Sequence, residues 1–394
     1  MPPPVRLVSA GALVNNVGGF VTMFLTVILV MRDISATKIA VALIVSSAFA
    51  VAGAWLGGRL LSRMPGKKVI SLSMIGSALF TAALIPAAPY LVTLAVVCLI
   101  ALCNRAYMPA ATTLVGSSSR PDQRLQMYSF FQLAYNIGAA VGPAIAGFLL
   151  TRSLTVLLII DAVTSIVFAV VTMRLPGDER PTAPRPADGE HTRESVLRDR
   201  RYLLFCVAAA LVAAAYAQRG GALPLAFHDR RYSLELLGYL FSGNAIAVVL
   251  FQLPLSFLTR KLDIRLTLAL GAAAIGGGYC LLLADFSKPL LVASTALWTA
   301  GEMAYAPAAP TAATMMSSSR THGTYQGTLY AARTAGQTLG PALGVLAYSA
   351  GASVAWWGCG VIGIVTAGLF LITVRPAPAA EPIVAISPAT GALE

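Results

Sequence analysis

Apolar residues along this chain fall into long runs that are separated by short polar segments. Most runs hold about 20 residues, enough for a helix to cross a hydrocarbon core of about 30 Å. A helix also satisfies its own backbone hydrogen bonds in lipid. A membrane barrel would instead show strands of about ten residues with alternating polarity. The pattern therefore predicts an all-α membrane protein with twelve transmembrane helices. The predicted spans are residues 7–31, 39–61, 69–86, 91–114, 127–150, 156–173, 202–226, 236–258, 266–283, 291–315, 327–349 and 355–374.

The second half of the chain repeats the first at an offset of 198 positions. Residues 106–113 (AYMPAATT) align with residues 304–311 (AYAPAAPT). We therefore expect two pseudo-symmetric six-helix bundles, residues 1–175 and 202–375. Two such halves around a site near the bilayer midplane are typical of transporters that work by alternating access. Without a gap, the same offset places Gly138, Gly142 and Pro143 on Gly336, Gly340 and Pro341.

The one long polar stretch lies between the two halves. Residues 176–201 begin rich in proline and charge, which is typical of a flexible linker, here expected on the cytoplasmic side. A regulatory segment is the alternative, since residues 194–201 suit a short helix on the membrane surface. Residues 376–394 predict a disordered cytoplasmic tail.

Hydrophobic residues make up 57% of the chain and charged residues 11%, which excludes an ordinary soluble protein. An even number of spans brings both termini to the same side of the membrane. Most of the Lys and Arg residues in loops lie on that side. The positive-inside rule then assigns both termini to the cytoplasm, with the chain crossing the cell membrane (plasma or inner) many times. The net charge of +12 is thus a topology signal, and we expect no nucleic-acid partner.

The five cysteines lie within predicted spans, and the three histidines lie in predicted loops. Their spacing fits neither a disulfide framework nor a zinc site. The chain also lacks a nucleophile or phosphate-binding motif that would indicate an enzyme. We expect no cofactor and no metal. The expected partners are a small-molecule substrate, protons and membrane lipid, with the chain acting as a monomer.

A glycine-rich motif marks the fifth predicted span. Residues 138–147 read GAAVGPAIAG, with glycines four apart on one helix face, where a neighbouring backbone can approach closely. Pro143 removes one backbone donor and can bend the helix there. The motif resembles the antiporter signature of the major facilitator superfamily, and nearly the whole chain is similar to the twelve-helix drug:proton antiporter branch. The resemblance implies a seal on one side of a central cavity. Simple helix packing is the alternative.

The loop after the second predicted span resembles the cytoplasmic gating loop of the same superfamily. Residues 58–68 read GRLLSRMPGKK, with Ser62 where the family has an aspartate. Arg63 and Lys67 are expected to contact helix C-termini or anionic lipid. The gating candidates are Gly58, Arg63, Lys67, Gly138, Gly142, Pro143, Gly336, Gly340 and Pro341.

Four ionisable residues within predicted spans, Arg105, Asp161, Glu302 and Arg333, are functional candidates because charge is costly there. Glu302, near the middle of the tenth span, is expected to carry protons or bind a cationic substrate. A structural ion pair with an arginine is the alternative. Asp161 is either a buried carboxylate that holds adjacent helices together or a second protonation site. Arg105 and Arg333 suit an anionic or zwitterionic substrate, and Arg333 alternatively holds Glu302 ionised until protonation releases it.

Two polar stripes run along predicted helices. Gln326, Tyr330, Arg333 and Gln337 are spaced to share one face, and Tyr128, Gln132 and Asn136 form the matching stripe in the first half. Such faces require a wet cavity or another helix. The substrate-binding candidates are Asn16, Asn104, Arg105, Gln132, Asn136, Gln218, Glu302, Tyr305, Tyr330 and Arg333.

Two functions remain open on these residues. The antiporter signature favours a proton-coupled exporter of small amphipathic molecules or drugs. The two arginines in the spans favour a proton-coupled symporter or facilitator for a small anionic or zwitterionic solute. A receptor or a membrane-embedded enzyme has no motif in its favour.

Overall fold

The computed structural model describes residues 1–86, 88–150, 153–175, 196–318 and 321–374. All regular structure among these residues is helical, as the sequence predicts. Most of the predicted linker and all of the predicted tail lie outside the described residues. In the first half the helices are α1 (Pro3–Gly18), α2 (Phe20–Val30), α3 (Ala36–Leu60), α4 (Gly66–Ala83), α5 (Tyr90–Ser117), η1 (Pro121–Gln123), α6 (Arg124–Leu150) and α7 (Leu154–Met173). In the second half they are η2 (Val196–Arg198), α8 (Arg200–Tyr216), η3 (Ala217–Gly220), α9 (Ala222–Asp229), α10 (Leu234–Thr259), α11 (Ile264–Cys280), η4 (Leu281–Leu283), α12 (Lys288–Met315), α13 (His322–Ala350) and α14 (Ala352–Thr373).

These helices account for the twelve predicted spans within the described part of the chain. The first span is divided into α1 and α2, and the seventh runs through α8, η3 and α9. By length and hydropathy alone, 7 helical segments are apolar enough to cross a membrane. The other spans are broken, as in α1 and α2, or carry polar positions, as in α12 and α13. The polar residues of α12 and α13 belong to a helix face that is turned away from lipid.

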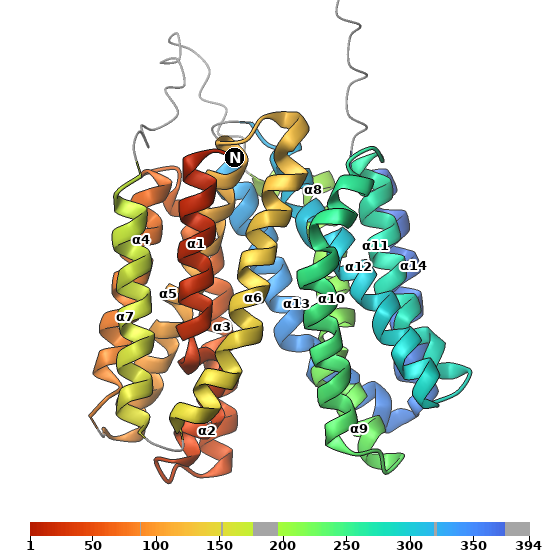
Figure 1. Cartoon of the computed structure of the whole chain (residues 1–394), viewed down its shortest axis with the longest axis horizontal. Helices are drawn as coiled ribbons and strands as arrows, with labels where there is room; N and C mark the ends of the chain where they lie inside the picture. Colours follow the sequence, from red (N-terminus) through yellow and green to blue (C-terminus); the bar gives the residue numbers. More distant parts are fainter. Residues whose placement is uncertain (87, 151–152, 176–195, 319–320, 375–394) are drawn as a thin grey trace, which may run out of the picture.

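The two halves form bundles that lie side by side (Figure 1). Helices α1 to α7 make one bundle and α8 to α14 the other, and the bundles approach each other at the end that carries the N-terminus. We call this the closed end. At the opposite end the bundles spread apart, and we call it the open end. The pairing inside each bundle is also repeated, since α6 packs on α1 as α13 packs on α8.

The repeat extends to the backbone of the loops. Asp33, after α2, and Arg231, after α9, both have left-handed backbone angles, with φ of 56° and 54°. These two positions correspond at the 198-residue offset. Such angles are uncommon outside glycine, so their recurrence indicates that the same turn follows the first span of each half.

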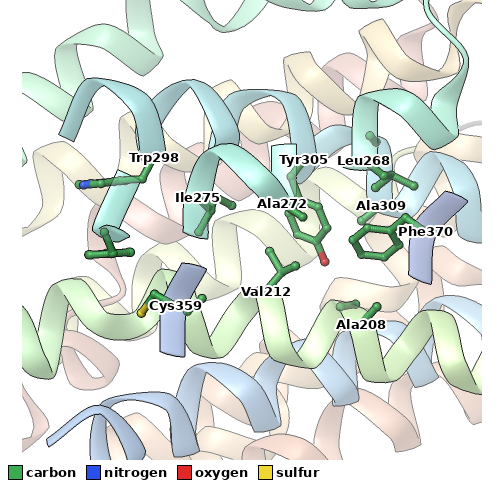
Figure 2. Close-up of a cluster of buried hydrophobic side chains, with 14 of the residues drawn as sticks. Ala208, Val212, Leu268, Ala272, Ile275, Trp298, Tyr305, Ala309, Cys359 and Phe370 are labelled. Atoms are coloured by element: carbon green, nitrogen blue, oxygen red, sulfur yellow. The ribbon is translucent and has the colours of Figure 1, made fainter. Parts of the chain in front are cut away.

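Aliphatic and aromatic side chains together form the core of the second bundle (Figure 2). Tyr279 lies between Trp298 and Trp356, in stacked pairs with centroid distances of 6.3 Å and 6.2 Å. Towards the closed end, Tyr305 packs against Phe370 at 5.8 Å. Large apolar side chains also cover the outside of both bundles, as Ile364 and Leu91 do. A helix that is apolar on the inside and the outside suits a lipid environment.

Candidate functional site

The closed end is sealed by close contact between α3 and α13. A methyl group placed on Gly327 would lie 2.6 Å from the Cα of Gly58, and one placed on Gly58 would lie 2.6 Å from the carbonyl oxygen of Gly323. Only glycine permits two helix backbones to approach so closely. Gly58, a gating candidate, therefore lies in the seam between the two halves.

A second contact repeats this crossing on the other side of the pseudo-twofold axis. The Ser129 hydroxyl on α6 donates a hydrogen bond to the Ser256 hydroxyl on α10 over 2.8 Å. At the 198-residue offset, Ser129 corresponds to Gly327 and Ser256 to Gly58. The closed end is thus held by two equivalent helix crossings, one through glycines and one through serines.

The seam has a buried polar centre between these crossings. Tyr128 on α6 and Gln326 on α13 occupy corresponding positions, and the Gln326 amide lies 3.5 Å from the Tyr128 hydroxyl. Both side chains bond to Thr314 on α12, Tyr128 at 2.8 Å and Gln326 at 3.0 Å. Gln326 also donates to the carbonyl of Pro310 at 2.8 Å. Of the two surroundings expected for the polar stripe, Gln326 therefore meets the second, other helices, because its side chain is fully buried in the seam.

A cavity of about 900 Å³ lies between the halves on the open side of this seam. Its walls come from α1, α5, α6 and α7 of the first bundle and from α8 and α10 to α13 of the second. On α6 the change from seam to cavity falls between Ser129 and Gln132. Exposed residues such as Arg219 and Ser242 also line it, so the cavity reaches solvent. A space of this size accepts a drug-sized molecule.

Nine of the ten substrate-binding candidates line the cavity, and so does Asp161. The exception is Gln218, which is 5% exposed. Its amide donates to the carbonyls of Ala214 and Gly340, and its oxygen accepts from the backbone N–H of Ala222. The interpretation of Gln218 as a substrate-binding residue does not fit this position, because its polar atoms are committed to the backbone.

Glu302 lies on the cavity wall of the second bundle. Its carboxylate accepts a hydrogen bond from the Asn244 amide at 3.1 Å, and Asn244 also donates to Thr299 at 3.0 Å. Tyr216 and Arg219 lie close enough to interact with it electrostatically. The alternative of a structural ion pair is not realised in this conformation, since the ion pairs within the described residues are His228–Asp229 and Asp263–Arg265.

Arg333 is held between two aromatic rings. Its guanidinium lies 5.6 Å from the ring centre of Tyr305 and 5.5 Å from that of Tyr330. Contacts of this kind stabilise the cation without neutralising it. Arg105 lines the opposite wall, on α5 of the first bundle. The cavity therefore contains basic groups from both halves and two carboxylates, Glu302 and Asp161, that have no arginine partner within 4 Å in the part of the chain described.

The remaining polar candidates are linked by hydrogen bonds along the first bundle. The Gln132 amide donates to Asn136 at 3.0 Å, one helical turn away on α6. Asn104 accepts from the Ser77 hydroxyl at 2.9 Å, and Asn16 donates to the carbonyl of Ala12 at 2.8 Å. These bonds fix the side chains that form the polar part of the wall.

The glycine motif packs within each bundle. A methyl group on Gly138 would lie 2.7 Å from the carbonyl oxygen of Leu13 on α1, and one on Gly340 would lie 2.7 Å from that of Ala214 on α8. Gly336 meets α8 in the same way, and Pro341 contacts Gly221. Gly142 is buried on α6, while the side chain of Pro143 lies outside the described part of the structure. The motif thus fixes the helices that line the cavity, whereas the seam itself is built from Gly58, Ser129 and their counterparts.

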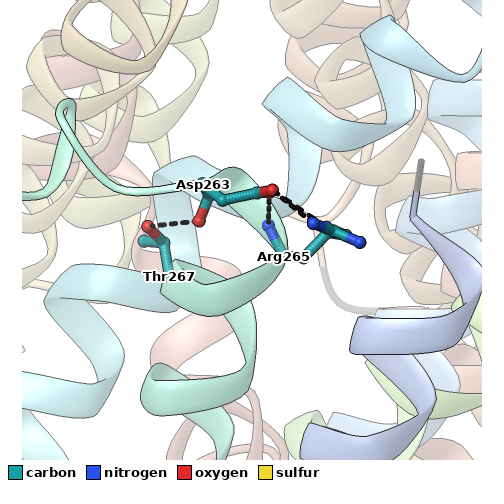
Figure 3. A network of polar contacts seen from close by, with 3 residues as sticks. All are labelled: Asp263, Arg265 and Thr267. Carbon is teal, nitrogen blue, oxygen red and sulfur yellow. Dashed lines mark hydrogen bonds and ion pairs between the residues drawn. The ribbon is translucent and has the colours of Figure 1, made fainter. Parts of the chain in front are cut away.

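The gating loop carries its basic residues at the closed end. Lys67 donates to the carbonyl of Leu175, just beyond the end of α7, at 3.3 Å, while Arg63 is exposed. The corresponding loop of the second half ends in a capped helix (Figure 3). There Asp263 accepts from the backbone and side chain of Arg265, at 2.9 Å and 2.7 Å. These hydrogen bonds lower the pKa of Asp263 below its usual value.

Sequence reasoning missed several residues of the cavity wall. Tyr216 and Arg219 both line it, and the Arg219 guanidinium lies 4.7 Å from the Tyr216 ring centre. Arg219 is not among the candidates taken from the sequence, although it lies within the predicted span 202–226. The adjacent Gly220-Gly221 pair marked a break in the helix and was the available signal. Tyr107 and Tyr135 also line the cavity and have no distinctive sequence context.

The fold and the cavity define a multi-pass membrane transporter. The family model of the Major Facilitator Superfamily matches the chain twice, over residues 8–218 and 205–392. The chain therefore belongs to this superfamily, as its motifs indicated.

Two relatives from Bacillus subtilis (strain 168) are MFS-type transporters. YttB is 26% identical over 365 residues, which cover 87% of this chain and 88% of YttB. YqjV is 22% identical over 292 residues, which cover 72% of this chain and 70% of YqjV.

Among solved structures, a bacterial homologue of the iron transporter ferroportin in an outward-facing state has a TM-score of 0.77 at 12% identity and covers 94% of this chain. FucP in the outward conformation has a TM-score of 0.75 at 13% identity with the same coverage. The human organic anion transporter MFSD10 has a TM-score of 0.68 at 16% identity and covers 95% of this chain. The match extends over 99% of the ferroportin homologue, 97% of FucP and 99% of MFSD10.

Proposed function

We propose that this protein is a proton-coupled secondary transporter that exports small amphipathic molecules by alternating access. The observation that carries the proposal is a cavity of about 900 Å³ between two repeated bundles, sealed at one end and containing Glu302 without an arginine partner within 4 Å in the described residues. A repeated pair of bundles around a central site is the arrangement on which alternating access depends.

The direction of opening follows from the charge distribution. Basic loop residues gather at the closed end, so the positive-inside rule assigns that end to the cytoplasm. On this assignment both termini are cytoplasmic, the protein lies in the cell membrane, and the cavity opens to the exterior. Two of the similar solved structures are described as outward-facing or outward, which supports the same assignment.

Glu302 is the proposed proton carrier. Carboxylates within membrane spans are the usual sites of proton relay in transporters. A cationic or polar substrate and a proton can compete for this one carboxylate, and such competition is what proton-driven exchange requires. Asn244 orients the carboxylate in either state, because its amide donates to a carboxylate or to the carbonyl oxygen of the neutral acid.

A second candidate function is supported by the arginines. Arg105 and Arg333 face the cavity from opposite halves, and Arg219 lies near its mouth. A small anionic or zwitterionic solute, carried together with a proton, would suit this wall. The human organic anion transporter among the similar structures is in keeping with this alternative.

Transport into vesicles of purified protein tests both functions. With a pH gradient imposed, Glu302→Gln should abolish proton-driven flux of a fluorescent amphipathic cation, whereas the matched control Asp285→Asn, in the exposed loop before α12, should transport as the unmodified protein does. Undiminished flux through Glu302→Gln would exclude this residue as the proton carrier. Flux of an organic anion, together with failure to move the cation, would favour the second function.

A further inference from the structure

Both bundles have a broken first span, and the breaks lie at similar places in the repeat. In the first half the helix stops at Gly18 and restarts at Phe20. In the second half it passes through η3 and restarts at Ala222. Each restart exposes backbone N–H groups that have no partner within the helix, and such groups are costly inside a membrane unless another group accepts from them.

In the first half, a carboxylate from another helix bridges the break. The Asp161 side chain on α7 accepts a hydrogen bond from the backbone N–H of Val21 at 2.9 Å, and the N–H of Phe20 also points to it. Asp161 is 2% exposed. It therefore acts as the cap of α2 although it lies 140 positions further along the chain.

In the second half, the side-chain amide of Gln218 caps the helix that restarts after the break. The Gln218 oxygen accepts from the N–H of Ala222, at the start of α9, at 3.4 Å. Its nitrogen donates to the carbonyls of Ala214 and Gly340. An amide does not titrate, so this break keeps the same hydrogen bonds at every pH. The two halves thus contain the same break with different chemistry.

The surroundings of Asp161 contain no compensating cation among the described residues. The helices that pack against α7 are α1, α2, α4 and α6, and α5 touches it through the Tyr107–Phe168 ring contact. The Asp161 carboxylate contacts the backbone N–H groups of Phe20 and Val21, and it forms no ion pair with a side chain of the described residues. The ionisable side chains on those helices are Arg6, Lys67, Lys68, Tyr90, Cys98, Cys103, Arg105, Tyr107, Arg124, Tyr128 and Tyr135.

We propose that Asp161 is a second proton-binding site, and that its protonation releases the hinge between α1 and α2. A carboxylate without a cation in a buried site favours the neutral form more than it does in water. In the neutral acid only the carbonyl oxygen remains a good acceptor, and the O–H group needs an acceptor of its own. The hydrogen bonds from the two N–H groups of α2 are then weaker than those to the carboxylate, and α2 becomes freer to move relative to α1.

Water from the open end supplies the proton. Asp161, Gly19 and Asn15 all line the cavity, so the break lies at its wall. Since α2 forms the outer part of the first span, its release changes the open end of the cavity and leaves the closed end unaffected. The proton-binding site stands on its own geometry, and only its effect on transport rests on the proposed function.

Hydrogen exchange of backbone amides tests the proposal on purified full-length protein. Exchange of a peptide that covers residues 19–24 should be measured between about pH 5.5 and pH 8, after correction for the intrinsic rate. We expect its protection to fall about fivefold or more on acidification, because the capping bonds open locally. The peptide around Ala222 serves as an internal reference and should keep constant protection.

Two variants separate titration from structure. Asp161→Asn replaces the carboxylate with an amide that does not titrate, so the protection of residues 19–24 should no longer depend on pH. Ser165→Ala removes a neighbouring bond between α7 and α1, from Ser165 to Asn15 at 3.1 Å, without a titratable group, and it should retain the pH dependence.

Constant protection of residues 19–24 in the unmodified protein would overturn the proposal, as would an equal change at both breaks. If Asp161→Asn fails to fold, the pH dependence of amide protection at the two breaks of the unmodified protein still tests the proposal. Loss of proton-driven transport in Glu302→Gln bears on the proposed function alone, because the exchange experiment requires no transport.

Discussion

The hydroxyl of Tyr128 on α6 lies 2.8 Å from the hydroxyl of Thr314 on α12, and this contact joins the two halves at the closed end. It is fully buried and lies beside Gln326, the counterpart of Tyr128 in the repeat. The bond exists only while the halves touch here, so it stabilises the observed conformation relative to one that opens at this end.

Tyr128→Phe should therefore weaken the seal. Loss of one buried hydrogen bond costs about 1 kcal/mol, which changes the ratio of the two conformations about fivefold. Spin labels at Asp122 and Lys261, exposed residues of the two halves near the closed end, would report a larger population at long distance. Tyr90→Phe, which removes a hydroxyl bonded to Lys38 in the first bundle, is the control and should leave the distance distribution unchanged.

Gly327→Ala should have a stronger effect on the same equilibrium. The added methyl group would lie 2.6 Å from the Cα of Gly58, which is backbone and cannot move aside without separating α3 from α13. Overpacking of this kind costs about 1–3 kcal/mol. The same pair of labels should show the closed end mostly open. Gly368→Ala, where a methyl group meets nothing within 4 Å, is the matched control. A closed end that stays closed in Gly327→Ala would show that this crossing does not hold the seam.

Arg333→Gln should reduce binding of organic anions selectively. A charge-assisted hydrogen bond contributes about 1.5–3 kcal/mol, so the dissociation constant of 2-naphthoate should rise about 10- to 100-fold. Neutral 2-naphthamide has the same shape and should be affected little. Binding is followed by the shift in thermal unfolding with ligand concentration. Arg260→Gln, at an exposed arginine near the Phe257 ring, is the control. Equal losses for the acid and the amide would indicate that Arg333 supports the wall and makes no direct contact with the anion.

Asp263→Ala should destabilise the start of α11 by about 0.5–2 kcal/mol, the usual contribution of a helix cap. Its effect should depend on pH in a defined direction. The pKa of Asp263 is lowered in the folded protein by hydrogen bonds from Arg265, so the contribution is present above the ordinary pKa of about 3.9 and is lost as the pH falls below it. Thermal unfolding at several pH values measures this. The difference from the unmodified protein should be constant near neutrality and vanish in strong acid. Asp122→Ala, at an exposed aspartate in η1, should show no such difference.

Much of the architecture was predictable because lipid imposes a simple rule on the backbone. Predicted spans such as 127–150 and 291–315 agree closely with α6 and α12, since a helix in lipid needs a continuous apolar stretch. The division of the first span was not predicted. No proline marks the break. The carboxylate that accepts from the free N–H group at the start of α2 belongs to Asp161, far along the chain.

The assignment of polar residues was less complete. Helical spacing placed Gln326 with Tyr330 and Arg333, yet Gln326 belongs to the seam and the other two to the cavity. One face of a helix can pack against the neighbouring bundle at one end and line the cavity at the other, because the two bundles touch only at the closed end. Spacing identifies which side chains share a face but carries no information about what each part of that face meets.

The number of membrane helices and the repeat of two halves could be derived from the order of residues alone, because they follow from local apolar length and from direct comparison of the two halves. Three relationships required the folded chain. Glu302 lies without an arginine partner within 4 Å among the described residues, Gly58 meets Gly327, and Asp161 caps a helix in another part of the bundle. Those relationships join residues far apart in the chain. They depend on how the helices pack within each bundle and across the seam, which the pattern along a single helix does not encode.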